Sequence, residues 1–238
     1  MAKNKSQAWK VEEAYTESLK STKVNKTRGI KYAILEKIIK ENLTDHMNIV
    51  ELFAGAGINT GFVLENVKPQ NLYLADISEE CVKVLTEKFG NLDYVTIKQT
   101  DSFTDIPDLY HCDFLFLDSA FKFSLMPRFE KLFEALKTIT CPICFTESEI
   151  YRLTFVKKEL QEGVRQVHFK KLMDFFKTLG YNTAKIYYCS SNCYLLLNKE
   201  DKFNSDGSVA EVEFIEYTEG SDKWRKFAYG EKINTDLI

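Results

Sequence analysis

Hydrophobic residues along this chain recur in two alternating patterns. Short apolar runs predict buried strands at 48–54, 71–77, 94–99, 112–118, 142–147, 182–189 and 192–198. In other segments, apolar residues recur every three or four positions, as on one face of a helix. This spacing predicts helices at 29–43, 60–67, 79–89, 126–138 and 164–179.

The order of these elements predicts the fold class. Strands that alternate with helices pair in parallel, because only a crossover helix returns the chain to the same end of the sheet. The last two runs, 182–189 and 192–198, are joined by a short Ser-Ser-Asn stretch and therefore predict an antiparallel hairpin. We expect an α/β fold with a doubly wound, seven-stranded sheet and this C-terminal hairpin at its edge.

Length and composition indicate one main globular domain. The chain has 238 residues, of which 45% are hydrophobic and 28% charged. We expect a basic N-terminal arm over 1–26, the main domain over 27–200 and a β-rich extension over 201–238. Within the extension, 209–217 and 224–230 are interpreted as a further hairpin or an extended arm.

Charge and cysteine usage narrow the expected environment. No apolar run approaches the roughly 20 residues that span a bilayer, and the N-terminus lacks an apolar signal region, so we expect a cytoplasmic or organellar-matrix protein without membrane contact. Six cysteines are too sparse for a disulfide framework and are expected to be reduced. The net charge of −3 gives no overall attraction to nucleic acid, yet residues 1–41 carry ten Lys and Arg against five Glu. This basic region suits either contact with phosphates or a solvated helix face.

The stretch NIVELFAGAGINTGF, residues 48–62, is an apolar strand that continues into a glycine-spaced turn and a helix. Gly55 and Gly57 let a ligand approach the backbone where the helix N-terminus offers free N–H groups. Such a turn suits a dinucleotide, a phosphate or another adenosine cofactor. A nicotinamide site usually has a third glycine where this chain has Thr60, which disfavours that alternative.

The next three strands each end in polar residues. Asp76 lies about 20 residues after the glycines, where a carboxylate can accept hydrogen bonds from both ribose hydroxyls. The third strand ends in 101–103, which could bond an adenine amine and cover its ring, and the fourth ends in 118–121. Since ligands of open sheets bind at the carboxyl ends of strands, we expect one site there.

In these motifs the chain resembles the class I S-adenosylmethionine-dependent methyltransferases, whose fold is Rossmann-like. VELFAGAG resembles their motif I, LADIS the motif II acid, TDS the adenine-contacting motif III and FLFLDSAF motif IV, within roughly 27–198. The resemblance implies S-adenosylmethionine as the cofactor. The cofactor contacts that we expect are Thr27, Phe53, Gly55, Gly57, Asn59, Thr60, Asp76, Ile77, Asp101, Ser102, Phe103 and Asp118.

Motif IV looks most like that of enzymes that methylate amino groups of nucleobases in RNA or DNA, where it is usually [DN]PP[YFW]. In those enzymes the acid and the next backbone carbonyl accept hydrogen bonds from the amine, and the aromatic ring stacks on the base. The resemblance implies these roles for Asp118, Ser119 and Phe121. Ser119 and Ala120 replace the two prolines, so the rigidity that prolines provide is missing.

This departure leaves three interpretations open: N-methylation of a base in RNA or DNA, methylation of a hydroxyl or protein side chain, and a catalytically inactive scaffold or assembly factor. Only 41 residues separate Asp76 from Asp118, so the base-recognition insert of the Dam-like DNA enzymes is absent. This absence favours structured RNA or a ribonucleoprotein over sequence-specific duplex DNA. A protein partner could bind through the N-terminal arm or the C-terminal hairpin.

Cys141 and Cys144 form a CxxC pattern that suggests zinc. They lie at the start of a predicted buried strand, where positions i and i+3 face opposite sides of the sheet. We therefore expect core thiols rather than a metal site. The three histidines are scattered and have no neighbouring acid or nucleophile, so we expect no histidine-based triad.

Overall fold

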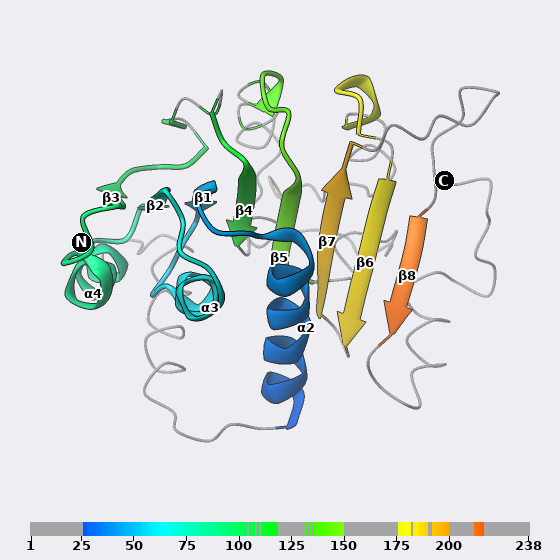
Figure 1. Ribbon diagram of the computed structural model, residues 1–238, viewed down its shortest axis with the longest axis horizontal. Coiled ribbons are helices and arrows are strands. Elements are labelled where there is room, and N and C mark those ends of the chain that lie inside the picture. Colours follow the sequence, from blue (N-terminus) through cyan, green and yellow to red (C-terminus); the bar gives the residue numbers. More distant parts are fainter. Residues whose placement is uncertain are drawn as a thin grey trace, which may run out of the picture.

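A mixed sheet forms the centre of the protein. The computed structural model describes residues 26–103, 105–107, 109, 111–118, 132, 134, 136–149, 176–181, 183–189, 192–199 and 212–216. Within these residues, eight strands pair in the order β3-β2-β1-β4-β5-β7-β6-β8 (Figure 1). Their bounds are β1 Asn48–Leu52, β2 Asn71–Asp76, β3 Val95–Gln99, β4 Phe114–Asp118, β5 Ile143–Glu149, β6 Thr183–Cys189, β7 Asn192–Asn198 and β8 Val212–Glu216.

The first five strands pair in parallel, as the alternation of strands and helices predicts. Helix α2 (Lys26–Asn42) precedes β1, α3 (Ile58–Asn66) joins β1 to β2, and α4 (Glu79–Phe89) joins β2 to β3. The chain runs outward from β1 to β2 and β3, and then returns to β4 on the other side of β1. The carboxyl end of β1 is therefore the switch point at which such sheets bind ligands.

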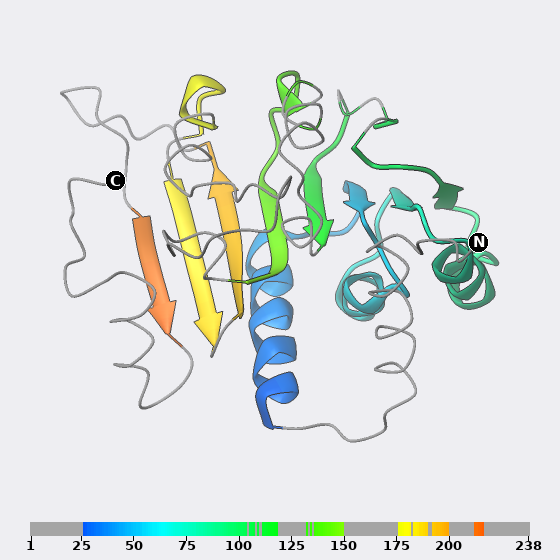
Figure 2. The same ribbon diagram turned by 180° about the vertical axis from the view of Figure 1, so that it is seen from behind.

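The antiparallel hairpin is also confirmed. Strands β6 and β7 pair in register from Thr183↔Asn198 to Cys189↔Asn192, and β7 is antiparallel to β5 as well. A further strand, β8, lies beyond the hairpin and pairs in parallel with β6 (Figure 2). The predicted tail segment 209–217 thus contains β8 and extends the main sheet. The other tail segment, 224–230, lies outside the described residues.

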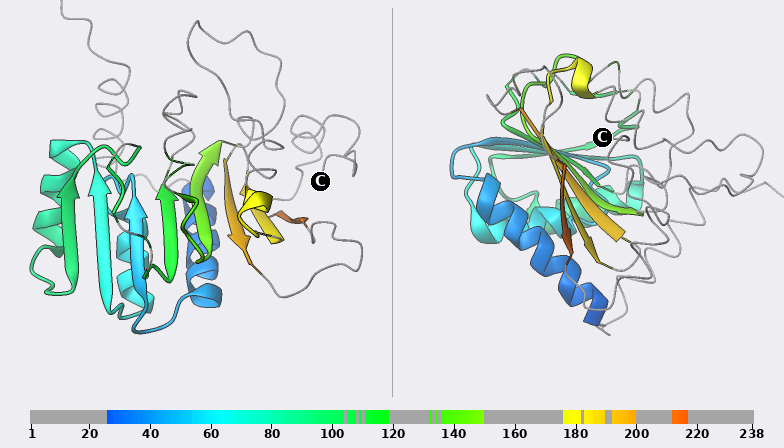
Figure 3. Two further views of the ribbon diagram at one scale, coloured as in Figure 1. Left: turned by 90° about the horizontal axis from the view of Figure 1, so that it is seen from above. Right: turned by 90° about the vertical axis from the view of Figure 1, so that its right-hand side faces the viewer.

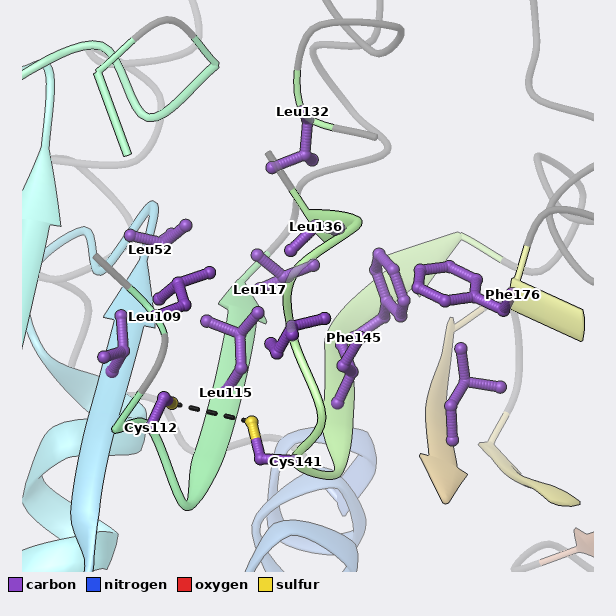
Figure 4. Close-up of a cluster of buried hydrophobic side chains, with 14 of the residues drawn as sticks. Leu52, Leu109, Cys112, Leu115, Leu117, Leu132, Leu136, Cys141, Phe145 and Phe176 are labelled. Carbon is purple, nitrogen blue, oxygen red and sulfur yellow. Dashed lines mark hydrogen bonds between the residues drawn. The ribbon is translucent and has the colours of Figure 1, made fainter. Parts of the chain in front are cut away.

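Alternation along the strands creates two hydrophobic clusters, one on each face. Helices α2, α3 and α4 lie on the same side of the sheet (Figure 3). The cluster beneath them includes Ile34, Ile38, Val63, Leu85, Phe114, Phe116, Cys144, Tyr187 and Tyr194. On the opposite face, the cluster drawn in Figure 4 includes Leu115, Leu117, Leu132, Leu136, Phe145 and Phe176.

These two clusters show that the described part of the sheet is buried on both faces, as a doubly wound α/β fold requires. Consecutive residues of β4 point to opposite faces, and both faces are covered. No helix in the described ranges has the length and apolar character that crossing a membrane requires.

Candidate functional site

The turn after β1 is held in an unusual backbone conformation. Phe53, Gly55 and Gly57 have positive φ angles of 61°, 55° and 75°. A positive φ is uncommon for a residue other than glycine, and the ring of Phe53 is packed 4.7 Å from that of Phe103. The Ala54 N–H donates to the carbonyl of Ala75 at 2.9 Å. The turn is therefore attached to the end of β2.

Asp76 at the end of β2 connects directly to this turn. The Gly55 N–H donates to Asp76 Oδ2 at 2.8 Å, and the Ser78 N–H donates to Oδ1 at 2.9 Å. Both bonds fix the plane of a carboxylate that is only half-buried. Its neighbour Ile77 is 58% exposed, and it is the one large hydrophobic side chain of the described residues that is exposed. The end of β2 thus presents an oriented carboxylate beside an apolar side chain.

The segment after β3 is more enclosed than the sequence indicates. Asp101 Oδ1 accepts a hydrogen bond from the Phe103 N–H at 3.1 Å. Ser102 is 2% exposed, and its hydroxyl has no hydrogen-bond partner among the described residues. Phe103 is 3% exposed and belongs to the hydrophobic cluster opposite α2. In this structure its ring packs in the core, and an adenine contact of 101–103 stays a prediction.

A buried carboxyl group lies under the turn. Glu51 in β1 is fully buried. Asn59 Nδ2 donates to Glu51 Oε1 at 3.0 Å, and the Thr60 hydroxyl donates to Oε2. Asn59 and Thr60 lie in the first turn of α3 and are themselves buried. Both were predicted to contact the cofactor, and in this structure both bind Glu51.

The same asparagine links Glu51 to Asp118. Asn59 Nδ2 also donates to Thr146 Oγ1 at 3.1 Å, and Thr146 Oγ1 donates to Asp118 Oδ1 at 2.6 Å. Asp118 and Thr146 are partners in the parallel register of β4 and β5. The sequence reasoning missed Glu51 and Thr146, although each is a polar residue within an apolar strand run. That interruption is the signal by which both residues could have been found.

Burial raises the pKa of Glu51 to about 8. The hydrogen bonds from Thr60 and Asn59 lower it, whereas the nearby carboxylates of Asp118 and Asp76 raise it. Glu51 is therefore mainly protonated at neutral pH. Only the two nearby carboxylates, Asp76 at the end of β2 and Asp118 at the end of β4, then carry negative charge, and these two charges favour a positively charged ligand.

Neither models of known protein families nor curated protein sequences match this chain. Solved structures do match. DhpI in complex with SAH superposes with a TM-score of 0.58 and 19% identity, covering 81% of this chain and 95% of that chain. The N-methyltransferase NodS from Bradyrhizobium japonicum WM9, also in complex with SAH, superposes with a TM-score of 0.57 and 10% identity, covering 79% of this chain and 98% of that chain. A SAM-dependent methyltransferase from Aquifex aeolicus superposes with a TM-score of 0.55 and 17% identity, covering 78% of this chain and 96% of that chain.

This chain has the fold of the S-adenosylmethionine-dependent methyltransferases. The predicted fold class is confirmed, and the nucleobase subtype stays a prediction. Ser119, Ala120 and Phe121, the rest of the predicted motif IV, lie outside the described residues. The backbone of Thr27 lies in the first turn of α2. The N-terminal end of this helix lies on the side of the sheet to which the arrowheads of β6 and β8 point (Figure 1).

Three of the described cysteines, Cys112, Cys141 and Cys144, lie within the hydrophobic clusters, whereas Cys81 is partly exposed. Cys144 belongs to the cluster beneath α2 and Cys141 to the opposite one, as their spacing predicts. Cys141 Sγ lies 3.6 Å from Cys112 Sγ (Figure 4). The hydrogen bond to Cys112 and burial both raise the pKa of Cys141. In the described ranges, no three His, Cys, Asp or Glu side chains are grouped so that they could hold a metal ion.

Gly57 in the turn is required by packing as well as by its φ angle. A Cβ at this position would lie 2.6 Å from Phe89 Cε2 and 2.7 Å from Leu85 Cδ2. The space that its missing side chain leaves is thus filled by α4. Close packing of α4 against the turn and the positive φ angle each favour glycine here, and the contact of Gly57 with the cofactor stays a prediction.

We expect Gly57→Ala to lower the free energy of unfolding by about 2 kcal/mol, through the strained φ and the contact with Leu85 and Phe89. Urea unfolding followed by circular dichroism measures this change. Gly61→Ala is the matched control, because Gly61 lies in α3 and a Cβ there meets nothing within 4 Å. The control should be neutral or stabilising by up to about 1 kcal/mol. Equal effects of the two substitutions would contradict the packing argument.

Proposed function

We propose that the protein is an S-adenosylmethionine-dependent methyltransferase that methylates an exocyclic amino nitrogen of a base in RNA. One observation carries the proposal. Asp76 and Asp118 lie at the carboxyl ends of β2 and β4, the two strands that flank the glycine turn after β1, in a chain with the methyltransferase fold. One carboxylate is thus available for a cofactor and the other for an acceptor.

The side chains around the turn suit this cofactor. Asp76 is oriented by the Gly55 and Ser78 N–H groups, and a carboxylate oxygen can accept more than one hydrogen bond, here from ribose hydroxyls. Ile77 offers an apolar surface for the adenine ring. The carboxylates of Asp76 and Asp118 favour the positive charge of the cofactor. When bound, S-adenosylmethionine supplies an electrophilic methyl group on a sulfonium.

Asp118 orients the acceptor in this proposal. Its carboxylate accepts a hydrogen bond from the amino group and aligns the nitrogen lone pair with the methyl group. A strong base is not needed, because the methylated nitrogen can release its proton to water. Thr146 already donates to Oδ1 of the same carboxylate at 2.6 Å.

Three features of the sequence support RNA as the acceptor: the motif IV resemblance, the short distance from Asp76 to Asp118, and the excess of Lys and Arg within residues 1–41. One feature supports a second candidate, a methyltransferase-fold scaffold without catalysis. Ser119 and Ala120 occupy the positions where the amino-methylating relatives have prolines. Turnover distinguishes the two candidates.

The test is calorimetric titration with S-adenosylmethionine and with S-adenosylhomocysteine, followed by transfer of a labelled methyl group to RNA, DNA and protein fractions. We expect micromolar binding of both and label that ribonuclease releases. Label found in protein alone would mean that the methyl acceptor is a protein rather than RNA. Cofactor binding without methyl transfer to any fraction would favour the scaffold. No binding at millimolar concentration would remove the cofactor assignment.

We expect Asp76→Ala to weaken S-adenosylhomocysteine binding roughly 10- to 100-fold, since a charge-assisted contact contributes about 1.5–3 kcal/mol. Calorimetry measures the change in dissociation constant. Asp113→Ala is the matched control: Asp113 Oδ2 also accepts a backbone N–H, from Asn48 at 2.7 Å, but at the amino ends of the strands. An affinity for Asp76→Ala within about threefold of the wild type would contradict the ribose assignment.

A further inference from the structure

We propose that Thr146 is a positioning residue that fixes the orientation of the Asp118 carboxylate, and that Asn59 fixes the direction in which the Thr146 hydroxyl points. The inference rests on the proposed function, because it assigns the residues that prepare Asp118 for the acceptor. Neither residue is placed in contact with the reacting atoms.

The protons that each group carries determine the direction of the Asn59–Thr146 and Thr146–Asp118 hydrogen bonds. Thr146 is fully buried, and its Oγ1 lies 3.1 Å from Asn59 Nδ2 and 2.6 Å from Asp118 Oδ1. An amide nitrogen only donates, and a hydroxyl carries a single proton. Thr146 therefore accepts from Asn59 and gives its proton to Asp118. With both bonds made, the carboxylate has one preferred orientation.

Asn59 is itself held from the other side. The second proton of its Nδ2 group bonds to Glu51 Oε1 at 3.0 Å, so both amide protons are used. Asn59 is 2% exposed, so its amide group is shielded from bulk solvent. The chain Glu51–Asn59–Thr146–Asp118 thus joins β1, α3, β5 and β4.

The backbone supports this assignment. Asp118 and Thr146 are register partners on adjacent strands, so their side chains lie on the same face of the sheet. Threonine is β-branched and stiff about χ1, which makes it a rigid donor. The residues after Asp118 lack the prolines that fix the backbone in the amino-methylating relatives. Support from β5 supplies rigidity that the sequence of motif IV does not.

Thr60 offers a matched comparison, because it is also a buried threonine whose hydroxyl donates to a carboxyl group. Thr60 bonds Glu51, and Thr146 bonds Asp118. Replacing either threonine with valine removes a hydroxyl and keeps the shape of the side chain. Thr146→Ser keeps the hydroxyl and loses only a methyl group.

The first measurement is ¹⁵N-edited NMR of the Asn59 side-chain amide in the ligand-free protein, assigned by its loss in Asn59→Ser. We expect Thr146→Val to move one of the two amide protons upfield, and Thr60→Val to affect mainly the other. Asp118→Asn should move the same proton as Thr146→Val, and Thr146→Ser should keep the wild-type pattern. If Asp118→Asn leaves that proton unchanged, Thr146 and Asp118 are not coupled and the inference is wrong.

The second measurement is methyl transfer to RNA. We expect Thr146→Val to lower kcat about tenfold or more, with KM for S-adenosylmethionine within about twofold, because a misplaced acceptor affects the chemical step. Thr146→Ser should restore kcat to within about threefold. An unchanged kcat in Thr146→Val would overturn the positioning role. Absence of transfer by the wild type would refute the proposed function alone, since the NMR response of Asn59 tests the Thr146–Asp118 bond independently.

Discussion

Replacing Glu51 with glutamine is expected to raise the free energy of unfolding by roughly 3–5 kcal/mol above pH 8. The pKa of Glu51 is about 8 in the folded protein against 4.5 for the unperturbed group. Between these values the folded protein holds a proton that the unfolded chain has released. Stability is therefore lost as the pH rises through this window, and the loss levels off above the folded pKa. Glutamine resembles the protonated acid and carries no charge, so it avoids the penalty.

Urea unfolding at several pH values between 5 and 9 measures this effect as the difference between the variant and the wild type. The difference should be small near pH 5 and grow towards pH 8. Glu65→Gln, on the exposed part of α3, corrects for the loss of one negative charge. A difference that is independent of pH, or a variant that becomes less stable as the pH rises, would contradict the assignment of Glu51 as a buried acid.

Replacing Asp118 with alanine is expected to lower kcat for methyl transfer to RNA by about 10²- to 10³-fold. The substitution removes the carboxylate oxygen that accepts a hydrogen bond from the amino group of the base in the proposed site. The Thr146 hydroxyl then loses its acceptor as well. Single-turnover transfer of a labelled methyl group measures the chemical step without a contribution from product release.

Asp113→Ala is again the control, since Asp113 lies just before β4 and Asp118 at its carboxyl end. We expect this control to retain transfer within about threefold of the wild type. Circular dichroism and thermal unfolding show whether each variant keeps its fold. Unchanged methyl incorporation in a folded Asp118→Ala protein would mean that motif IV does not orient the acceptor.

Local patterns were sufficient to predict most of the secondary structure. The apolar run at 112–118 contains β4, and the helical spacing at 79–89 coincides with α4. The short link between β6 and β7 allowed only a hairpin. The parallel half followed from the crossover helices, because a crossover has few allowed topologies. The position of β8 beside β6 could not be predicted from the sequence, since an alternating pattern predicts a strand but not the strand with which it pairs.

The candidate site was predicted only in part. Gly55 and Asp76 occupy a turn and a strand end whose spacing appears in the sequence, and they are hydrogen-bonded in the structure. Phe103 is buried beside Phe53, and its contact with the cofactor stays a prediction. Aromatic residues suit both ligand contact and core packing, so residue type alone did not decide between these roles.

The sequence by itself determined the elements, their alternation and the polar strand ends, because each depends on periodicities within a few residues of the chain. Only the tertiary structure decided that Glu51, Asn59, Thr146 and Asp118 form one buried chain. Asn59 and Thr146 are 87 positions apart and meet only because the order of the sheet, β1-β4-β5, brings β5 close to the start of α3, which follows β1. Such contacts depend on strand order and register, which are set by the burial of whole faces rather than by any local pattern.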